Sequence, residues 1–415
     1  MKRVTLLLLV GVIGMMLLAC TPKEQTLVIF QNKIEIDEVL RTYAEAWGVA
    51  NGIDVEVKSC GGDTCAYGTQ ILAEFQADQQ PDIFVIEGMG GYNIYKDKIL
   101  ELNGEDWAAD TDLEFVVDGK TYGFPVAVEG WGMAYNEDIL TAAGVDIEAL
   151  KDVSQAEYAA VFAQIQAYYT TNNLTDYAVV SMAAGPGMTW VTGLHNFNGY
   201  LSAGLDYSDS SVIDDLNAGV ANATRLSQLA DWVELLYQFA DETILTTGGY
   251  NEQVGKFAEG KAAFIHQGNW TDSSYAESDF EMGYLPHATM TTGNDSIFIG
   301  APSYYVINKD SQSIDNAKLF LNDLASTAEG HDYMVNKAHM VPAFNSVTLV
   351  PSTPLSAAVM EWNQAGKAYA WWQNDMPSGF GMDTMGPIYS LYAAGTITKA
   401  EFIAQLTAAI EDLAD

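Results

Sequence analysis

Short apolar runs alternate with segments of helical periodicity in the first part of the chain. The runs at 27–30 and 82–86 predict buried strands, and residues 53–57 alternate as a half-buried strand does. Apolar residues at 36–47 and 67–79 recur at helical spacing. This order of strands and helices predicts an α/β domain with a parallel sheet and helical crossovers.

A glycine-rich apolar stretch at 122–136 interrupts this pattern. It contains Glu129 and Trp131, an unusual pair for a buried strand, and it follows Asp118-Gly119, a strong signal for a two-residue hairpin. We interpret the stretch as a crossing from one hydrophobic body into another, with ligand-binding groups at the hinge.

A second body begins beyond this crossing. Ser154 and Glu157 form a capping-box pattern before a helical segment, and Thr398 and Glu401 form another before the terminal helix. Residues 298–302 predict a second crossing, and the chain returns once more near 345–350. The predicted domains are lobe 1 (26–127 and 300–347) and lobe 2 (128–299 and 348–415).

The N-terminus reads as a secretory signal. Lys2 and Arg3 precede an apolar run that is too short for a membrane span with flanks, and small residues lead to Cys20. We therefore predict a signal peptide at 1–19 and, because the Cys20 site resembles a bacterial lipobox, a lipidated tether at 20–25. The expected location is extracytoplasmic, with the lipoprotein anchored to the bacterial membrane.

Lipidation of Cys20 leaves Cys60 and Cys65 as a pair across a Gly-Gly turn. In an exported chain, this spacing favours a disulfide over free thiols or a metal site. No histidine is close in sequence, so we expect no metal.

The composition excludes several classes of protein. The formal net charge of −37 disfavours binding to nucleic acid and indicates a soluble, acidic surface. The sequence contains no phosphate-binding loop, nucleophile-elbow or zinc-protease motif, so we expect no cofactor. The length suggests two domains.

Four ordered stretches resemble a known family. Residues 81–84, 90–92, 122–136 and 257–270 are similar in order and spacing to the extracellular sugar-binding proteins of bacterial ABC importers (family 1), including their maltose- and maltodextrin-binding members. The resemblance implies a two-lobed periplasmic-binding-protein-like fold (type II), with a ligand cleft between lobes joined by hinge crossings. It further implies a monomeric receptor without catalytic residues, whose partners are a carbohydrate and an ABC permease.

Sugars offer hydroxyl edges to carboxylates and amides, and C–H faces to aromatic rings. By the resemblance, Glu129 and Trp270 match sugar-contacting positions, Glu87 and Asn32 lie at ligand-contacting strand ends, and Trp190 lies on a cleft loop. The resemblance also places Trp371 and Trp372 in the closing aromatic segment, where at most one should contact ligand. Trp131 is a candidate from its position alone, with core packing as the alternative role. The predicted ligand-binding residues are Glu87, Glu129, Trp131, Trp190, Trp270, Trp371, Trp372 and Asn32.

Two other functions remain open from the residues. Glu87 and Glu129 across a cleft would suit a surface glycoside hydrolase in residue type. A receptor for a polyamine or a peptide would also use the acidic groups, although it would leave the aromatic residues less well explained. His195 and His266 lie near the expected cleft, without an assigned role.

Overall fold

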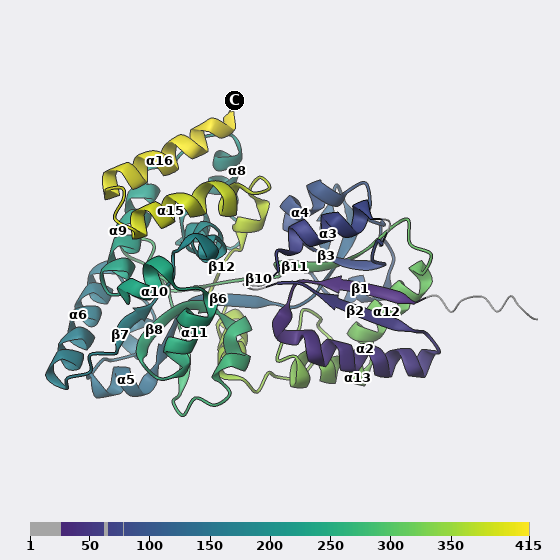
Figure 1. Cartoon of the computed structure of the whole chain (residues 1–415), viewed down its shortest axis with the longest axis horizontal. Helices are drawn as coiled ribbons and strands as arrows, with labels where there is room; N and C mark the ends of the chain where they lie inside the picture. Colours follow the sequence, from purple (N-terminus) through teal and green to yellow (C-terminus); the bar gives the residue numbers. More distant parts are fainter. Residues whose placement is uncertain (1–25, 62–64, 78, 415) are drawn as a thin grey trace, which may run out of the picture.

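The structure is a computed structural model that describes residues 26–61, 65–77 and 79–414. Two lobes, each built on its own sheet, lie side by side and are connected by narrow crossings (Figure 1). Cys20, the predicted signal peptide and the tether lie outside the described residues.

The lobe 1 sheet has the strand order β2-β1-β3-β11-β5-β4 among the described residues. Strand β1 pairs in parallel with β2 and β3, as the sequence predicts, whereas β11 runs antiparallel to β3 and β5. The strands are β1 Leu27–Gln31, β2 Val55–Ser59, β3 Ile83–Glu87, β4 Phe115–Val117, β5 Lys120–Pro125 and β11 Ser303–Ile307. The predicted hairpin is confirmed, since Asp118 and Gly119 join β4 to β5 with φ values of 51° and 73°.

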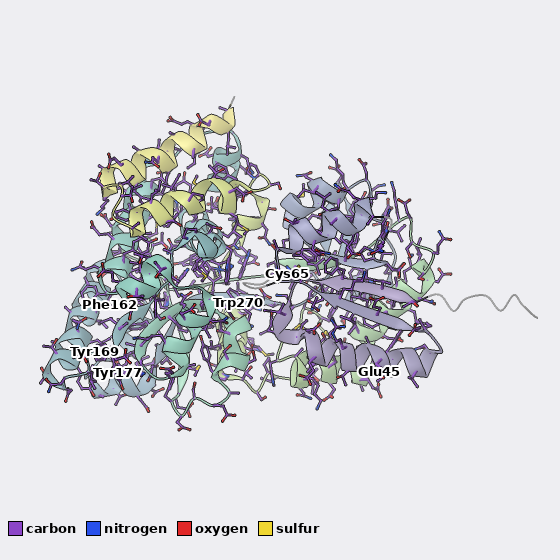
Figure 2. The ribbon with its side chains drawn as sticks, in the orientation of Figure 1. Glu45, Cys65, Phe162, Tyr169, Tyr177 and Trp270 are labelled. Carbon is purple, nitrogen blue, oxygen red and sulfur yellow. A yellow bond between two sulfur atoms is a disulfide. The ribbon has the colours of Figure 1, made fainter. Side chains whose placement is uncertain are left out.

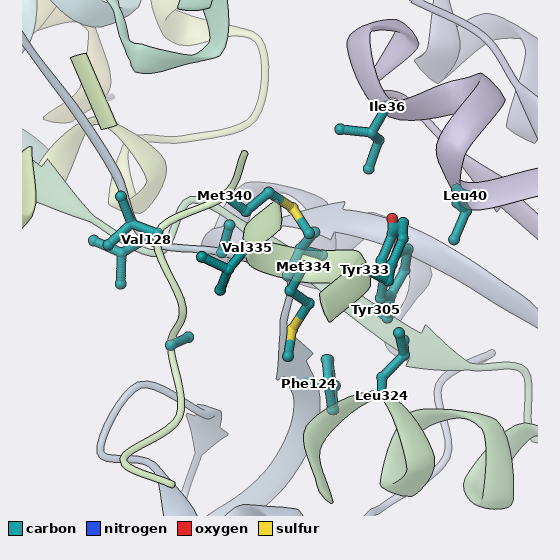
Figure 3. Close-up of a cluster of buried hydrophobic side chains, with 14 of the residues drawn as sticks. Ile36, Leu40, Phe124, Val128, Tyr305, Leu324, Tyr333, Met334, Val335 and Met340 are labelled. Atoms are coloured by element: carbon teal, nitrogen blue, oxygen red, sulfur yellow. The ribbon is translucent and has the colours of Figure 1, made fainter. Parts of the chain in front are cut away.

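Both faces of the lobe 1 sheet are covered by helices. Alternate residues of β3 enter different apolar clusters, because Ile83 and Val85 pack with α2 and α12 whereas Phe84 and Ile86 pack with α3 and α4. These helices are α2 Asp37–Asn51, α3 Tyr67–Gln76, α4 Gly88–Tyr95, α12 Ile314–Ser326 and the short α13 Ala328–Asp332. Part of the first cluster is shown in Figure 3, where Tyr305, Tyr333 and Leu324 lie close together.

The lobe 2 sheet has the order β12-β10-β6-β8-β7, and β9 also pairs with β6. Its strands are β6 Glu129–Asn136, β7 Ala178–Ser181, β8 Ala262–Gly268, β9 Met282–Leu285, β10 Ile297–Gly300 and β12 Ala368–Tyr369. The predicted capping boxes are present at Ser154 and Thr398, where they begin α6 and α16. The helices of this lobe are α5 Glu137–Ala142, α6 Gln155–Thr171, α7 Phe197–Ser202, α8 Ser211–Asn217, α9 Ala223–Gln238, α10 Glu242–Thr247, α11 Tyr250–Ala258, α14 Pro354–Gln364, α15 Gly386–Ala393 and α16 Lys399–Glu411.

The crossings between the lobes run next to each other. The chain leaves β5 at Pro125 and enters β6 at Glu129, and it returns from β10 at Gly300 into β11 at Ser303. Gly300 pairs with Glu129 in the lobe 2 sheet. A β-carbon at Gly300 would overlap Trp371, so the glycine lets that tryptophan lie against the crossing.

Candidate ligand-binding site

A polar cluster of Asn32, Lys33, Glu87 and Glu129 lies beside the first crossing. Lys33 follows β1, and its ammonium group donates a hydrogen bond to Oε1 of Glu129 at the start of β6. The Glu35 carboxylate lies 3.8 Å from the same nitrogen. Burial lowers the pKa of Lys33, but the charges of Glu129 and Glu35 more than offset this effect and leave the pKa above its ordinary value. Lys33 therefore remains a cation that connects lobe 1 to the hinge.

Glu87 completes the polar cluster from the carboxyl end of β3. It accepts a hydrogen bond of 2.8 Å from Nδ2 of Asn32, and the side chain is still exposed. Desolvation by nearby protein groups raises the pKa of Glu87, and Lys33 only partly opposes that rise. Oδ1 of Asn32 is buried and has no hydrogen-bond partner among the described residues. An orphaned acceptor next to an exposed carboxylate suits a hydroxyl donor.

An aromatic cluster of Trp190, His195, Trp270 and Trp371 belongs to lobe 2. The Trp270 ring lies 4.9 Å from His195, 6.2 Å from Trp190 and 6.4 Å from Trp371, measured between ring centroids. Its Nε1 donates to Oε1 of Gln267 over 3.0 Å, which fixes the ring. Figure 2 shows Trp270 on the side of lobe 2 that faces lobe 1.

His195 lies among these rings and is 8% exposed. Burial lowers its pKa well below the ordinary value, and the charges of His266 and Lys33 add to the effect. Its imidazole is therefore neutral at pH 7, so that one ring nitrogen donates and the other accepts. No hydrogen bond to this side chain occurs within the described residues. Glu129 of the polar cluster pairs with Gly300, and Gly300 lies against Trp371 of the aromatic cluster, so the two clusters lie close together at the crossings.

Trp131 differs from the other predicted site residues. The side chain is fully buried, and its ring stacks on Phe298 at 4.0 Å with an interplanar angle of 15°. His266 and His287 contact it edge to face at 5.0 and 5.2 Å. The structure thus favours the packing role over the predicted stacking role, because surrounding side chains cover the indole.

The adjacent tryptophans Trp371 and Trp372 occupy different surroundings. Trp371 is 8% exposed and contacts His195 and Trp270, which places it in the aromatic cluster. Trp372 is partly exposed, lines a separate pocket, and donates from Nε1 to the backbone oxygen of Asp209 over 2.9 Å.

Three further observations bear on the predictions from sequence. Cys60 and Cys65 are joined as a disulfide with Cα atoms 5.2 Å apart. No group of three or more potential metal-ligating side chains occurs in the described parts of the chain. No helix between residues 26 and 414, in the described ranges, is long and apolar enough to cross a bilayer.

Sequence comparison matches residues 33–330, more than half of the chain, to the family of bacterial extracellular solute-binding proteins. The chain belongs to this family. The solute-binding protein is 24% identical over 265 residues to the maltodextrin-binding protein MdxE of Bacillus subtilis, and the match covers 62% of this chain and 59% of MdxE. It is 23% identical over 322 residues to a maltooligosaccharide ABC transporter solute-binding lipoprotein of Streptococcus pneumoniae, covering 75% and 71% of the two chains. These relatives are binding proteins rather than enzymes.

Solved structures share the fold. A sugar transporter protein of Bacillus licheniformis in complex with stachyose superposes with a TM-score of 0.72 at 18% identity, over 94% of this chain and 100% of its own. RafE of Streptococcus pneumoniae in complex with raffinose gives a TM-score of 0.72 at 14% identity, over the same shares. The predicted two-lobed type II fold is confirmed, and the relatives support the predicted carbohydrate-binding receptor.

The list of predicted site residues omitted Lys33 and His195. The sequence could have identified Lys33, since it follows Asn32 after the first strand and is a lone cation to pair with the two predicted carboxylates. His195 was expected near the cleft, but the sequence assigned it no role, because its contacts depend on a π-helical stretch, Trp190–Asn196, that no periodicity marks.

Proposed function

We propose that this solute-binding protein is an extracytoplasmic receptor that captures a carbohydrate between its lobes and delivers it to an ABC permease. The observation that carries the proposal is the position of the polar cluster and the aromatic cluster next to the crossings between the lobes. Carboxylate, amide and neutral imidazole groups orient hydroxyls, and the rings of Trp190, Trp270 and Trp371 cover C–H faces. Glu87, Asn32 and Glu129 complete the proposed set.

The mechanism is a shift of population toward the closed form. Asn32, Lys33 and Glu87 come from lobe 1, whereas Trp270 and its neighbours come from lobe 2. A sugar contacts both groups only when the lobes approach each other, so binding favours closure. The permease then recognises the closed form.

The remaining features of the proposal concern location and assembly. The signal peptide 1–19 is removed, and Cys20 carries lipid on the tether 20–25, which anchors a monomer to the membrane. Lobe 1 comprises 26–127 and 300–347, and lobe 2 comprises 128–299 and 348–415. The protein binds its sugar without hydrolysing it.

A thermal-shift screen of residues 26–415 tests the function. The panel contains mono- and oligosaccharides, polyamines and short peptides. A ligand at about a hundred times its dissociation constant adds roughly 2.7 kcal/mol to the free energy of unfolding, which raises the melting temperature by several degrees. A shift with one class of sugar supports the proposal. A shift with spermidine or a peptide alone contradicts the sugar assignment and keeps the fold.

A turnover assay separates binding from hydrolysis. We expect no release of chromophore from chromogenic glycosides by the wild-type protein. Turnover that Glu129→Gln abolishes while binding persists would instead establish a glycoside hydrolase.

A further inference from the structure

A pocket of about 410 Å³ lies in lobe 2, well away from the crossings. Strand β6 starts at Glu129, beside the first crossing, and ends at Asn136, which lines this pocket. At a rise of about 3.3 Å per residue, the length of the strand separates the pocket from the crossing by about 23 Å. Tyr177, another lining residue, lies in the part of lobe 2 away from lobe 1, whereas Trp270 lies on the side that faces lobe 1 (Figure 2). The pocket is therefore separate from the proposed sugar site.

Three aromatic rings from different parts of the chain line this pocket, which we call the tyrosine pocket. Tyr168 lies near the end of α6, Tyr177 just before β7, and Phe280 just before β9. Each ring is partly buried and packs against a buried ring. Measured between centroids, the two tyrosines lie 6.0 and 5.3 Å from Tyr169, and Phe280 lies 5.3 Å from Phe257. The three rings are thus held in place and present aromatic faces and edges to the pocket.

Among the described residues, the only charged side chains that line the tyrosine pocket are Asp138 and Asp279. Both are exposed, and neither carboxylate forms a hydrogen bond or an ion pair with another described residue. Lys256 and Lys261, the lysines close to this region in sequence, each pair with two other carboxylates. The two aspartates therefore have no cationic partner in the described part of the chain. Aromatic faces also attract cations, so the rings and the carboxylates favour the same kind of ligand.

Asn136 adds an unused hydrogen-bond donor to the tyrosine pocket. The residue is only 2% exposed, and its Oδ1 accepts a hydrogen bond of 3.1 Å from the backbone N–H of Ile139 at the start of α5. This bond fixes the amide group, and Nδ2 has no acceptor among the described residues. Buried donors usually have a protein, water or ligand partner. The free donor therefore favours a ligand that carries an acceptor oxygen.

We propose that the tyrosine pocket is a second binding site, which takes a small organic ammonium that also carries a hydroxyl group. The ammonium lies against the rings and beside the two carboxylates, and the hydroxyl oxygen accepts a hydrogen bond from Asn136. The volume is in the range of small-molecule sites in proteins. A neutral sugar would leave both negative charges without a counter-charge, and an anion would be repelled by them. Every lining residue belongs to lobe 2, so binding here does not require closure of the lobes.

Isothermal titration of the wild-type protein with choline tests the proposal, together with two matched probes. The alcohol 3,3-dimethyl-1-butanol has the shape of choline without its charge, and tetramethylammonium has the charge without the hydroxyl. We expect saturable binding of choline at one site per chain. Tetramethylammonium should bind about threefold more weakly, because it offers no acceptor to Asn136. The neutral alcohol should bind at least about tenfold more weakly, because it lacks the attraction to the carboxylates and rings.

Substitutions locate the bound cation. The double variant Asp138→Asn with Asp279→Asn should weaken choline binding by about tenfold, each single substitution by about threefold, and Phe280→Leu by about threefold. Melting temperatures identify any variant that is unstable, and the single substitutions remain informative if the double variant does not fold. Asp152→Asn changes an exposed carboxylate of lobe 2 outside the pocket and should leave the Kd unchanged.

Four outcomes would overturn the site. They are no saturable binding of choline or tetramethylammonium, equal affinity for the neutral alcohol, unchanged affinity in the folded aspartate variants, and loss of choline binding with Glu87→Gln. The last outcome would place the cation at the hinge, where we expect Glu87→Gln to have no effect on choline. The first three leave the proposed sugar receptor as it stands, because its test uses sugars and the residues at the crossings.

Discussion

The polar cluster at the hinge and the pocket lined in part by Asp214, Trp372 and Asp375 both carry carboxylates. The hinge carboxylates have partners, and Asp214 accepts a hydrogen bond from Ser210, but Asp375 differs from them. Glu129 is paired with Lys33, and Glu87 accepts from Asn32. Asp375 has no side-chain partner within the described residues. The hinge carboxylates are therefore held in place before a ligand binds. In the pocket, the Asp375 carboxylate lacks a hydrogen-bond partner that a ligand could supply. The paired hinge carboxylates can orient a ligand. The unpaired Asp375 carboxylate lowers the stability of the ligand-free protein but is available to bind a ligand group.

The largest expected effect on stability comes from breaking the ion pair between Lys33 and Glu129 at the hinge. Glu129→Gln removes the hydrogen-bonded partner of Lys33, whose side chain is 12% exposed, and leaves a nearly buried cation with only the more distant Glu35 carboxylate near it. We expect the free energy of unfolding to fall by about 3 kcal/mol in urea titrations. Replacing both partners, Lys33→Met with Glu129→Gln, should recover only part of this loss, because the Glu35 carboxylate, 3.8 Å from the Lys33 nitrogen, then lacks its cation.

A surface ion pair provides the matched control. Lys98 and Asp310 lie 3.0 Å apart with side chains 39% and 52% exposed, so Asp310→Asn should cost less than about 1 kcal/mol. Equal effects of the two carboxylate substitutions would show that the hinge pair is no more buried in solution than a surface pair.

Removing the Trp270 ring should weaken binding strongly with little effect on folding. The ring is partly exposed and lies on the rim of the aromatic cluster, so Trp270→Ala should cost about 2 kcal/mol of binding free energy, near thirtyfold in Kd. Trp270→Phe should retain most of the affinity, since it keeps an aromatic face. Calorimetry gives both values, and a large drop in melting temperature with Trp270→Ala would show a structural role instead.

The sequence predicted the frame of the molecule better than the orientation of its site residues. Alternation and caps located the sheets, the hairpin at Asp118 and the first crossing because these depend on local backbone preferences. The contact of Trp371 with His195, and the opposite surroundings of Trp372, depend on packing between segments far apart in sequence. Trp131 shows the same limit, since no local pattern distinguishes a ring stacked on Phe298 from one that faces a ligand.

The smallest expected effect on stability comes from changing the unpaired carboxylate of Asp375. Burial, together with the nearby Asp214 carboxylate, raises the pKa of Asp375 from 3.8 to about 6, so the folded state holds the proton more tightly than the unfolded state does. Its contribution to stability is present below about pH 4 and is lost as pH rises through 6. Asp375→Asn should therefore raise the free energy of unfolding by about 1 kcal/mol at pH 7, after allowance for partial exposure, and change it little at pH 4.

Melting curves at the two pH values, without ligand, measure this difference. We expect the Asp375→Asn variant to melt about 2 °C above wild type at pH 7. Asp215→Asn, which alters a carboxylate outside the pocket, should not reproduce the pH dependence. An Asp375→Asn variant that is less stable than wild type at pH 7 would mean that the ionised carboxylate has a stabilising partner in solution. The contrast with the hinge carboxylates would then fail, because both regions would be satisfied before any ligand binds.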